Sequence, residues 1–173
     1  MSPGEVPCGT HTCHVYRTRA ELLATLVPFF AAGLRANERC AWLTSGPLTE
    51  GLARSALARA GVDVDEAAHS GQLSVVPHAE WYFKKEHLTV DRLADLWLLE
   101  EEKALDLGYS GLRVSGNVSP TQARGWKASL HHEEVTQRAF RGRHIVALCS
   151  YAREKCGASE VFELARRHSH VLT

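Results

Sequence analysis

The densest group of chemically versatile side chains lies near the N-terminus. Two cysteines, two histidines and a tyrosine fall within nine residues, at Cys8, His11, Cys13, His14 and Tyr16. Imidazole nitrogen and thiolate sulfur bind soft and borderline metal ions. The same groups can instead hydrogen-bond a small polar ligand, or the thiol can react with an electrophile. This stretch therefore predicts a ligand-sensing site or a metal site, with a polar buried strand as the alternative that needs no ligand.

Alternating β-forming residues over 11–17 predict that this stretch is a strand. Every second residue of a strand shares a face, so one face carries His11 and Cys13 and the other carries His14 and Tyr16. Because His14 points away from His11, all four metal-site candidates (Cys8, His11, Cys13 and His14) cannot bind one ion while the strand is regular. We keep Cys8, His11 and Cys13, with Cu, Zn or haem as cofactor, as the alternative to a small organic ligand. The main hypothesis assigns no cofactor.

The rest of the chain alternates between strand and helix patterns. Further strands are expected at 39–44, 72–76, 111–116, 144–149 and 170–172, and helices at 18–34, 48–60, 89–107, 119–142 and 159–167. Residues 62–66 are expected to form a connecting turn and 78–88 a loop or lid. Such alternation implies right-handed βαβ crossovers. We predict a three-layer α/β fold with a mostly parallel central sheet, in one domain over 1–173 that begins with a flexible segment, 1–10.

Ligands of such folds collect beyond the carboxyl ends of the strands. The run 144–149 is almost continuously apolar, which predicts a central strand. If it neighbours the first strand, Cys13 and Cys149 face one cavity. Arg113 lies in an otherwise apolar strand and must be paired, either with an anionic ligand group or with a carboxylate such as Glu134. The candidate ligand-binding residues are His11, Cys13, Tyr16, Arg113, Asn117, Cys149 and Tyr151.

Composition excludes several classes of function. Twenty basic residues balance twenty acidic ones, so the chain lacks the basic excess typical of direct nucleic-acid binding. No apolar run approaches the roughly 18 residues of a membrane span. The N-terminus lacks the pattern of a signal peptide, which predicts a cytoplasmic location and free thiols among the five cysteines.

Common enzyme signatures are absent from the sequence. There is no GxxxxGK[ST] phosphate loop, no GxGxxG and no GxSxG. The run 131–134 (HHEE) lacks the second histidine of HExxH because residue 136 is threonine. It is therefore expected to be a polar helix face, with Glu134 pairing Arg138. The charged run 100–103 is likewise expected to face solvent. We predict that the protein is not an enzyme.

Five ordered fragments resemble the MEDS domain, the methanogen/methylotroph, DcmR-type sensory domain. They are His11-x-Cys13-x-x-Tyr16, Phe30-x-x-Gly33-Leu34-x-x-x-Glu38-x-Cys40, Gly71-Gln72-Leu73, Gly108-Tyr109-x-Gly111-Leu112-Arg113 and Leu148-Cys149-x-Tyr151. The resemblance covers nearly the whole chain, to His168-x-His170-Val171. One departure follows the fourth strand, where the family has Gly-Glu-Met-Ser-Trp and this chain has Gly116-Asn117-Val118-Ser119-Pro120.

The resemblance implies a signal-input domain of a prokaryotic transcriptional or two-component regulator. Its ligand would be a small organic molecule, one-carbon or hydrocarbon-derived, and its partner an output domain or protein outside this chain. A homodimer is one arrangement for its assembly. The fold would be related to RecA/KaiC-like cores that have lost the phosphate loop. A RecA-like nucleotide-binding enzyme stays as a remote alternative.

Overall fold

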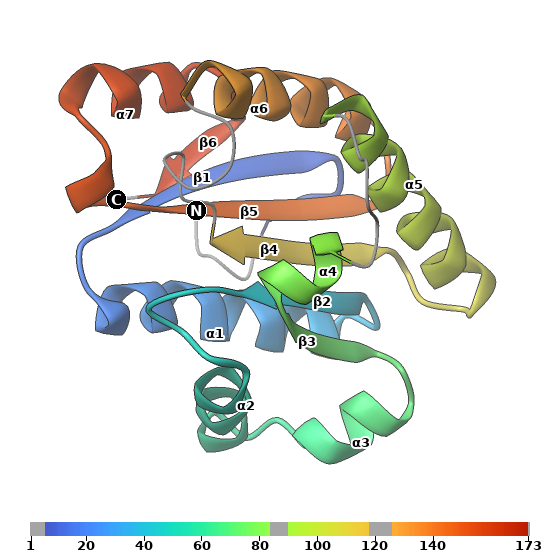
Figure 1. Ribbon diagram of the computed structural model, residues 1–173. Helices are drawn as coiled ribbons and strands as arrows, with labels where there is room; N and C mark the ends of the chain where they lie inside the picture. Colours follow the sequence, from blue (N-terminus) through green and yellow to red (C-terminus); the bar gives the residue numbers. More distant parts are fainter. Residues whose placement is uncertain (1–5, 84–89, 118–125, 173) are drawn as a thin grey trace.

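A six-stranded, wholly parallel sheet forms the centre of the molecule (Figure 1). The computed structural model describes residues 6–83, 90–117 and 126–172. The strand order is β3-β2-β4-β5-β1-β6. The strands are β1 (Thr10–Tyr16), β2 (Arg39–Thr44), β3 (Leu73–Pro77), β4 (Leu112–Asn117), β5 (Ile145–Ala152) and β6 (His170–Leu172). The predicted central position of the fifth strand is confirmed.

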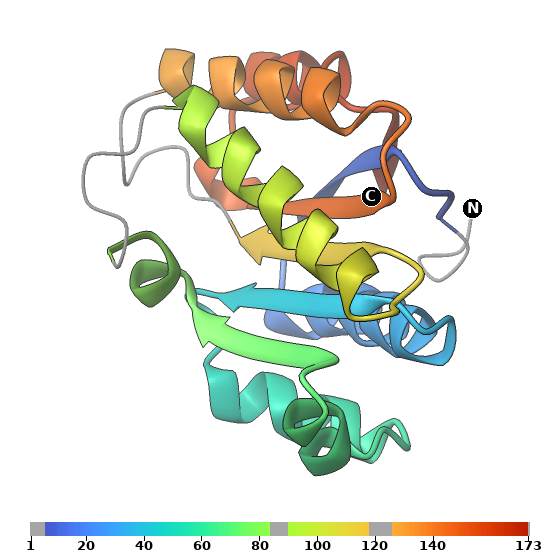
Figure 2. The same ribbon diagram turned by 90° about the vertical axis from the view of Figure 1, so that its right-hand side faces the viewer.

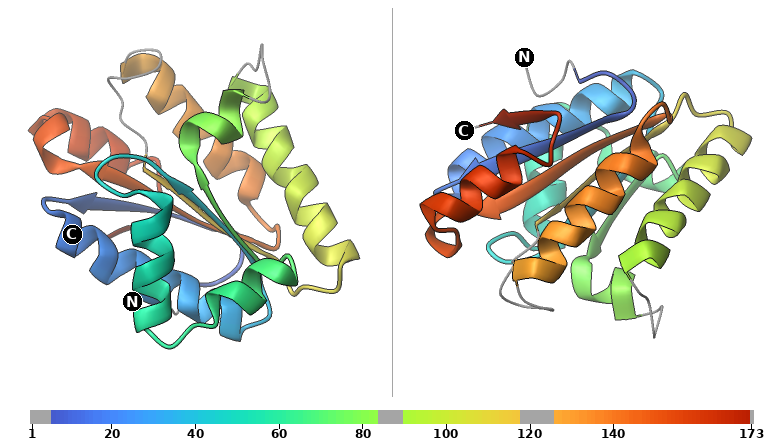
Figure 3. Two further views of the ribbon diagram at one scale, coloured as in Figure 1. Left: turned by 60° about the horizontal axis from the view of Figure 1, so that its bottom comes forward. Right: turned by 90° about the horizontal axis from the view of Figure 1, so that it is seen from above.

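Helices cover both faces of the sheet, which confirms the predicted three-layer α/β fold (Figures 2 and 3). One face packs against α1 (Arg19–Arg35), α2 (Glu50–Arg59) and α3 (Val64–His69). The other packs against α5 (Val90–Asp106), α6 (Trp126–Phe140) and α7 (Ala158–Ala165). We call these the α1 face and the α6 face. The short helix α4 (His78–Phe83) follows β3, and a 3₁₀ turn, η1 (Arg153–Lys155), follows β5.

Two short helices were not predicted. The expected turn at 62–66 is wrong because α3 begins there, with the Asp63 side chain accepting a hydrogen bond from the Glu66 amide at 3.0 Å. The expected loop or lid at 78–88 begins instead as α4, and its remainder, 84–89, lies outside the described residues. In contrast, the predicted cap of α1 is present, where Thr18 Oγ1 accepts from the Glu21 amide at 3.1 Å.

The register between β1 and β5 sets the positions of the chemically active side chains. His11 pairs with Ala147 and Cys13 with Cys149. In parallel strands, paired residues point to the same face. His11 and Cys13 therefore project toward α6 and α7, whereas His14 projects toward α1, where its Nε2 lies 3.1 Å from Thr25 Oγ1. The predicted alternation of faces along the first strand is confirmed.

Each face of the sheet has its own hydrophobic core. On the α1 face, Phe30 stacks on Trp42 with ring centroids 4.8 Å apart. On the α6 face, Trp97 and Phe140 pack over β4 and β5. Of the segment 1–10 that was expected to be flexible, residues 1–5 lie outside the described part of the chain, and Val6 is buried in the α1-face core.

The charged run of α5 does not lie wholly in solvent, so that prediction is wrong for two of its members. Glu101 is 1% exposed and accepts a hydrogen bond from Arg143 Nε at 2.6 Å. Glu100 accepts one from Arg39 Nη1 at 2.7 Å. These ion pairs attach α5 to the amino ends of the strands. Among the described residues, no helix has the length and apolar character needed to cross a membrane.

Candidate functional site

Four side chains with metal-ligand chemistry meet beneath α6. They come from separate elements: His11 from β1, Glu133 from α6, Cys149 from β5 and His168 from the connection between α7 and β6. One nitrogen, oxygen or sulfur atom of each lies within 4.8 Å of the corresponding atom of every other. His11, Glu133 and His168 are buried, and Cys149 is half-buried. We call this group the His–Glu–Cys cluster.

The carboxylate of Glu133 is the centre of the cluster. Its Oε1 accepts a hydrogen bond from the hydroxyl of Tyr151. Its Oε2 lies 3.2 Å from His11 Nε2 and 3.0 Å from His168 Nε2. Neither contact has the geometry of a hydrogen bond, so Glu133 Oε2 has no hydrogen-bond partner among the described residues. A buried carboxylate oxygen in this state is unusual, because buried polar atoms are nearly always hydrogen-bonded.

A backbone carbonyl fixes which ring nitrogen of His168 carries a proton. Its Nδ1 lies 2.8 Å from the carbonyl oxygen of Leu164. A carbonyl can only accept, so Nδ1 carries the proton and, in the neutral ring, Nε2 presents a lone pair. That lone pair faces Glu133 Oε2 at 3.0 Å. In the neutral form of the ring, two acceptors would face each other across this gap, which a proton on Nε2 or a bound cation would bridge.

Burial and neighbouring groups shift the ionisation of the cluster. Burial, together with the nearby His168, lowers the pKa of His11 to about 4, which favours the neutral imidazole at neutral pH. Burial, reinforced by the Glu133 charge, raises the pKa of the Cys149 thiol. Without a cation, the sulfur is therefore a thiol rather than a reactive thiolate.

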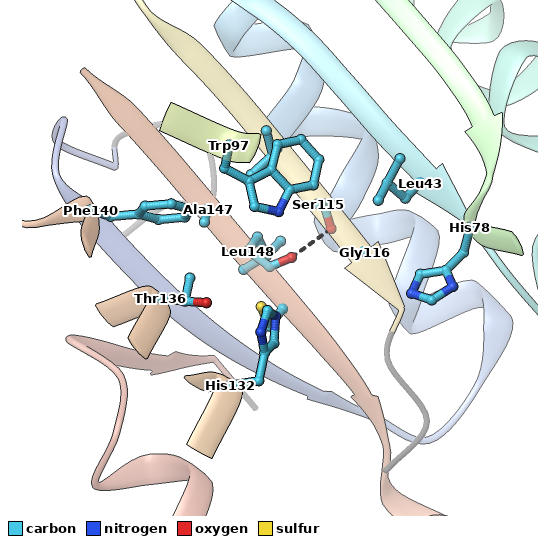
Figure 4. Close-up of a pocket in the computed structure, with 12 residues that line it drawn as sticks. Leu43, His78, Trp97, Ser115, Gly116, His132, Thr136, Phe140, Ala147 and Leu148 are labelled. Carbon is cyan, nitrogen blue, oxygen red and sulfur yellow. Dashed lines mark hydrogen bonds between the residues drawn. The ribbon is translucent and has the colours of Figure 1, made fainter. Parts of the chain in front are cut away.

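A small cavity of about 40 Å³ adjoins the cluster between the sheet and helices α5 and α6 (Figure 4). Apolar side chains form most of its wall, among them Trp97 and Phe140. Cys149 belongs to the wall as well as to the cluster. A water molecule needs about 10–15 Å³ of such space, so the cavity accepts roughly three water-sized groups. Its size suits a molecule of a few heavy atoms.

Polar groups enter the cavity wall from two sides. His132 and Thr136 come from α6, and His78, the first residue of α4, lies across from them (Figure 4). Thr136 Oγ1 and His132 Nδ1 are buried without a hydrogen-bond partner in the described part of the chain. An apolar wall with a few polar atoms directed at one space is typical of small-molecule sites.

The structure brings together three of the predicted ligand-binding residues. His11, Cys149 and Tyr151 all surround Glu133. Cys13 lies beside Cys149 in the sheet, and burial raises the pKa of its thiol to about 12. Cys13 is not one of the four residues of the cluster.

The remaining predicted ligand-binding residues lie elsewhere. Tyr16 is on the α1 face. Arg113 is also on that face, where its guanidinium pairs with Glu38. Asn117 ends β4 beside Ser150, and its side chain lies outside the described atoms.

The alternative metal set is dispersed over the molecule. Cys8 is exposed ahead of β1, and His14 faces α1 on the opposite side of the sheet from His11. His11 alone of the set Cys8, His11, Cys13 and His14 belongs to the His–Glu–Cys cluster.

Sequence reasoning missed two members of the cluster, Glu133 and His168. The expected Glu134–Arg138 pair is present at 3.5 Å, but the preceding carboxylate points inward. A signal did exist, because Glu133, Thr136 and Phe140 follow helical spacing and form one buried stripe. His168 gave no such signal, since it lies in an irregular connection.

The chain was compared with models of known protein families. The family model of MEDS, the MEthanogen/methylotroph, DcmR Sensory domain, matches residues 10–169. No curated protein matches the chain. The matched segment includes every residue of the cluster and of the cavity wall.

Proposed function

The chain belongs to the MEDS family of sensory domains, and we propose that it senses a small organic molecule bound in the cavity beside Cys149. The ligand class is a one-carbon or short hydrocarbon-derived compound with one or two polar atoms. The observation that carries the proposal is the cavity itself: it measures about 40 Å³, is mostly apolar, and has polar atoms in its wall without a hydrogen-bond partner among the described residues.

The polar atoms supply the specificity in this proposal. The Thr136 hydroxyl and the Nδ1 atom of His132 are buried and unpartnered among the described residues, so each gains a hydrogen bond when a ligand presents a complementary atom. The aromatic wall supplies the affinity, because a methyl or methylene group placed against Trp97 leaves water.

A ligand bound in the cavity would contact several strands and helices at once. The cavity wall draws on β2, β4, β5, α5 and α6. A ligand that prefers one packing of α5 and α6 against the sheet shifts the population toward that packing. An output domain or partner protein that recognises α5 or α6 would then respond to the ligand. In this proposal the signal arises from the packing of the two helices, without any chemical conversion of the ligand.

The proposal is tested by adding methanol, methylamine or chloromethane to the protein, with 1-octanol as a compound too long for the cavity. Tryptophan fluorescence is the readout, because Trp97 lines the cavity and stacks on Trp81 with centroids 4.9 Å apart. We expect saturable changes with at least one of the one-carbon compounds and none with 1-octanol. Absence of saturable binding by all three one-carbon compounds contradicts the proposal.

Two substitutions make the test specific to the cavity. Val114→Ile adds a methylene to the wall and is expected to weaken binding by about tenfold or more, whereas Val146→Ile on the α1 face leaves affinity unchanged. Thr136→Val removes the unpartnered hydroxyl and is expected to weaken binding about 3–10-fold. Thr12→Val is the matched control, because it removes a buried hydroxyl that also lacks a hydrogen-bond partner within the described part of the chain but does not line the cavity.

A further inference from the structure

We propose that His11, Glu133, Cys149 and His168 form a four-coordinate site for a divalent transition-metal ion of the Zn²⁺ class. Zinc binds nitrogen and oxygen ligands at about 2.0 Å and sulfur ligands at about 2.3 Å. In a tetrahedral site, the ligand atoms therefore lie roughly 3.3–3.5 Å from one another. In the structure, His11 Nε2 lies 3.2 Å from Cys149 Sγ and 3.2 Å from Glu133 Oε2, and His168 Nε2 lies 3.0 Å from that same oxygen. One ligand atom of each residue lies within 4.8 Å of the ligand atoms of the other three.

The unpartnered atoms of the cluster point to a cation. Glu133 Oε2 and His168 Nε2 are fully buried, and neither has a hydrogen-bond partner among the described residues. A metal ion between them gives this oxygen and this nitrogen a ligand bond each. A purely structural hydrogen-bond network would instead place a donor opposite each acceptor.

Neighbouring groups already orient two of the four ligands. The Leu164 carbonyl holds the proton of His168 on Nδ1, which leaves Nε2 available for the metal. The Tyr151 hydroxyl occupies Glu133 Oε1, which leaves Oε2. Metal sites commonly fix imidazole and carboxylate ligands by such outer hydrogen bonds. His11 Nδ1 has no such bond within the described residues.

The donor set also selects the kind of metal. Two imidazole nitrogens, one sulfur and one carboxylate oxygen suit Zn²⁺ and its neighbours, whereas Mg²⁺ and Ca²⁺ prefer oxygen ligands throughout. On binding, the Cys149 thiol gives its proton to solvent and its sulfur becomes a thiolate ligand. The thiolate and the Glu133 carboxylate then carry two negative charges, which balance the divalent ion in the buried site.

Such an ion would connect parts of the fold that are far apart in sequence. It would join β1, β5 and α6 to the connection between α7 and β6. The segment 158–172 packs at the edge of the sheet through the short β6, whose residues are half-buried or exposed. Metal binding is thus expected to hold this segment on the sheet. The inference does not depend on the proposed small-molecule ligand, because it rests on the cluster and not on the cavity.

The site is tested with protein freed of metal by a chelator and then titrated with Co²⁺ and Zn²⁺. We expect one ion per chain, a thiolate-to-cobalt charge-transfer band, visible bands of tetrahedral intensity, and displacement of Co²⁺ by Zn²⁺. Cys149→Ser is expected to remove the charge-transfer band. Cys13→Ser, which changes the adjacent buried thiol outside the cluster, is expected to keep it.

Two further measurements distinguish the loss of metal binding from a failure of the variant to fold. Glu133→Gln and His168→Gln are expected to weaken Zn²⁺ binding by more than about 100-fold while the circular dichroism spectrum of the metal-free protein stays unchanged. Amide hydrogen exchange in wild-type protein is expected to slow across residues 158–172 when Zn²⁺ is added. The inference is overturned if folded protein binds neither ion, if the charge-transfer band survives Cys149→Ser, or if Cys13→Ser removes it.

Discussion

Two buried carboxylates, Glu38 and Glu133, lie on opposite faces of the sheet. They differ in how many of their oxygen atoms and neighbouring polar atoms have hydrogen-bond partners. On the α1 face, Glu38 accepts from Arg113 Nε, and Arg113 Nη1 donates to the Phe29 carbonyl at 3.2 Å. The guanidinium also lies 4.7 Å from the centroid of the Phe29 ring. On the α6 face, Glu133 leaves one oxygen without a hydrogen-bond partner in the described chain, beside an imidazole nitrogen in the same state. The first pair is satisfied by its own neighbours, whereas the second group leaves two buried atoms free for the proposed metal ion.

The sequence fragments that resemble the family contribute residues to both of these carboxylate groups. Gly33, Glu38 and Arg113 form the complete pair and its packing on the α1 face. His11 and Cys149 contribute to the incomplete group on the α6 face. We therefore propose a structural role for the first set and a binding role for the second. The comparison predicts that substitutions on the α1 face change stability and that substitutions on the α6 face change binding.

The largest effect is expected from Glu38→Gln. This change leaves the Arg113 guanidinium buried without a counter-charge, so the free energy of unfolding should fall by about 3–5 kcal/mol. Urea unfolding monitored by circular dichroism measures it. Glu134→Gln, which removes one side of the exposed pair with Arg138, is the control and should change stability by less than about 0.5 kcal/mol. If Glu38→Gln lowers the free energy of unfolding by no more than the control does, the proposed difference between the two carboxylates is wrong.

The next effect is a pH dependence of stability from His14 on the α1 face. Burial lowers the pKa of His14 to about 4, with a smaller opposing effect from Glu21. The unfolded chain therefore takes up a proton between about pH 6.5 and 4 that the folded chain does not, and stability falls as pH falls through this window. The loss for one such group is up to about 3 kcal/mol.

His14→Gln is the variant that isolates this contribution. It should remove part of the pH dependence between pH 6.5 and 4, because glutamine can still meet the hydroxyls of Thr25 and Ser150 without titrating. The measurement is the free energy of unfolding as a function of pH for wild type and variant. Parallel curves for the two proteins would show that His14 does not titrate differently in the folded state.

Gly33→Ala tests how tightly the α1-face pair is packed. A Cβ atom at Gly33 would lie 2.5 Å from Arg113 Cδ and 2.8 Å from Glu38 Oε2. The buried pair would have to move, and we expect a loss of about 1–3 kcal/mol in the free energy of unfolding. Gly51→Ala in α2 meets no atom within 4 Å and is expected to stabilise the protein by about 0.5–1 kcal/mol. Equal outcomes for the two substitutions would contradict this packing.

The smallest stability effect is expected from Glu133→Gln in metal-free protein. The amide oxygen can still accept from Tyr151, and its NH₂ group can donate to the lone pair of His168 Nε2. We therefore expect a change of about 1 kcal/mol or less, although Glu133 is as deeply buried as Glu38. A loss comparable to that of Glu38→Gln would mean that Glu133 is part of the structural framework, and it would remove the distinction between the two faces.

Periodicity predicted much of the fold, and together with residue type and the family resemblance it predicted two of the four cluster residues, His11 and Cys149. Alternation along the first strand placed His11 and Cys13 on one face and His14 on the other, as the structure shows. The apolar run 144–149 indicated a central strand, and its adjacency to the first strand brought Cys13 opposite Cys149. These predictions succeed because strand period and burial are local properties of the sequence.

The other half of the cluster depends on contacts between distant segments. Arg113 required a buried partner, but Glu38 became that partner only because β2 and β4 are neighbours. Glu133 sits in a run of four polar residues, and its inward direction follows from how α6 lies on the sheet. His168 reaches the cluster from an irregular connection whose path no periodicity fixes. Tertiary packing, rather than local pattern, assembles the site.

The most direct test of the account is an anomalous difference map from crystals of the protein grown with Zn²⁺, measured at the zinc absorption edge. The account predicts one strong peak within bonding distance of His11 Nε2, Glu133 Oε2, Cys149 Sγ and His168 Nε2. A map without a peak there, from crystals in which these four side chains keep their mutual contacts, would contradict it. Such a map would show that both faces of the sheet carry polar groups that are complete by themselves.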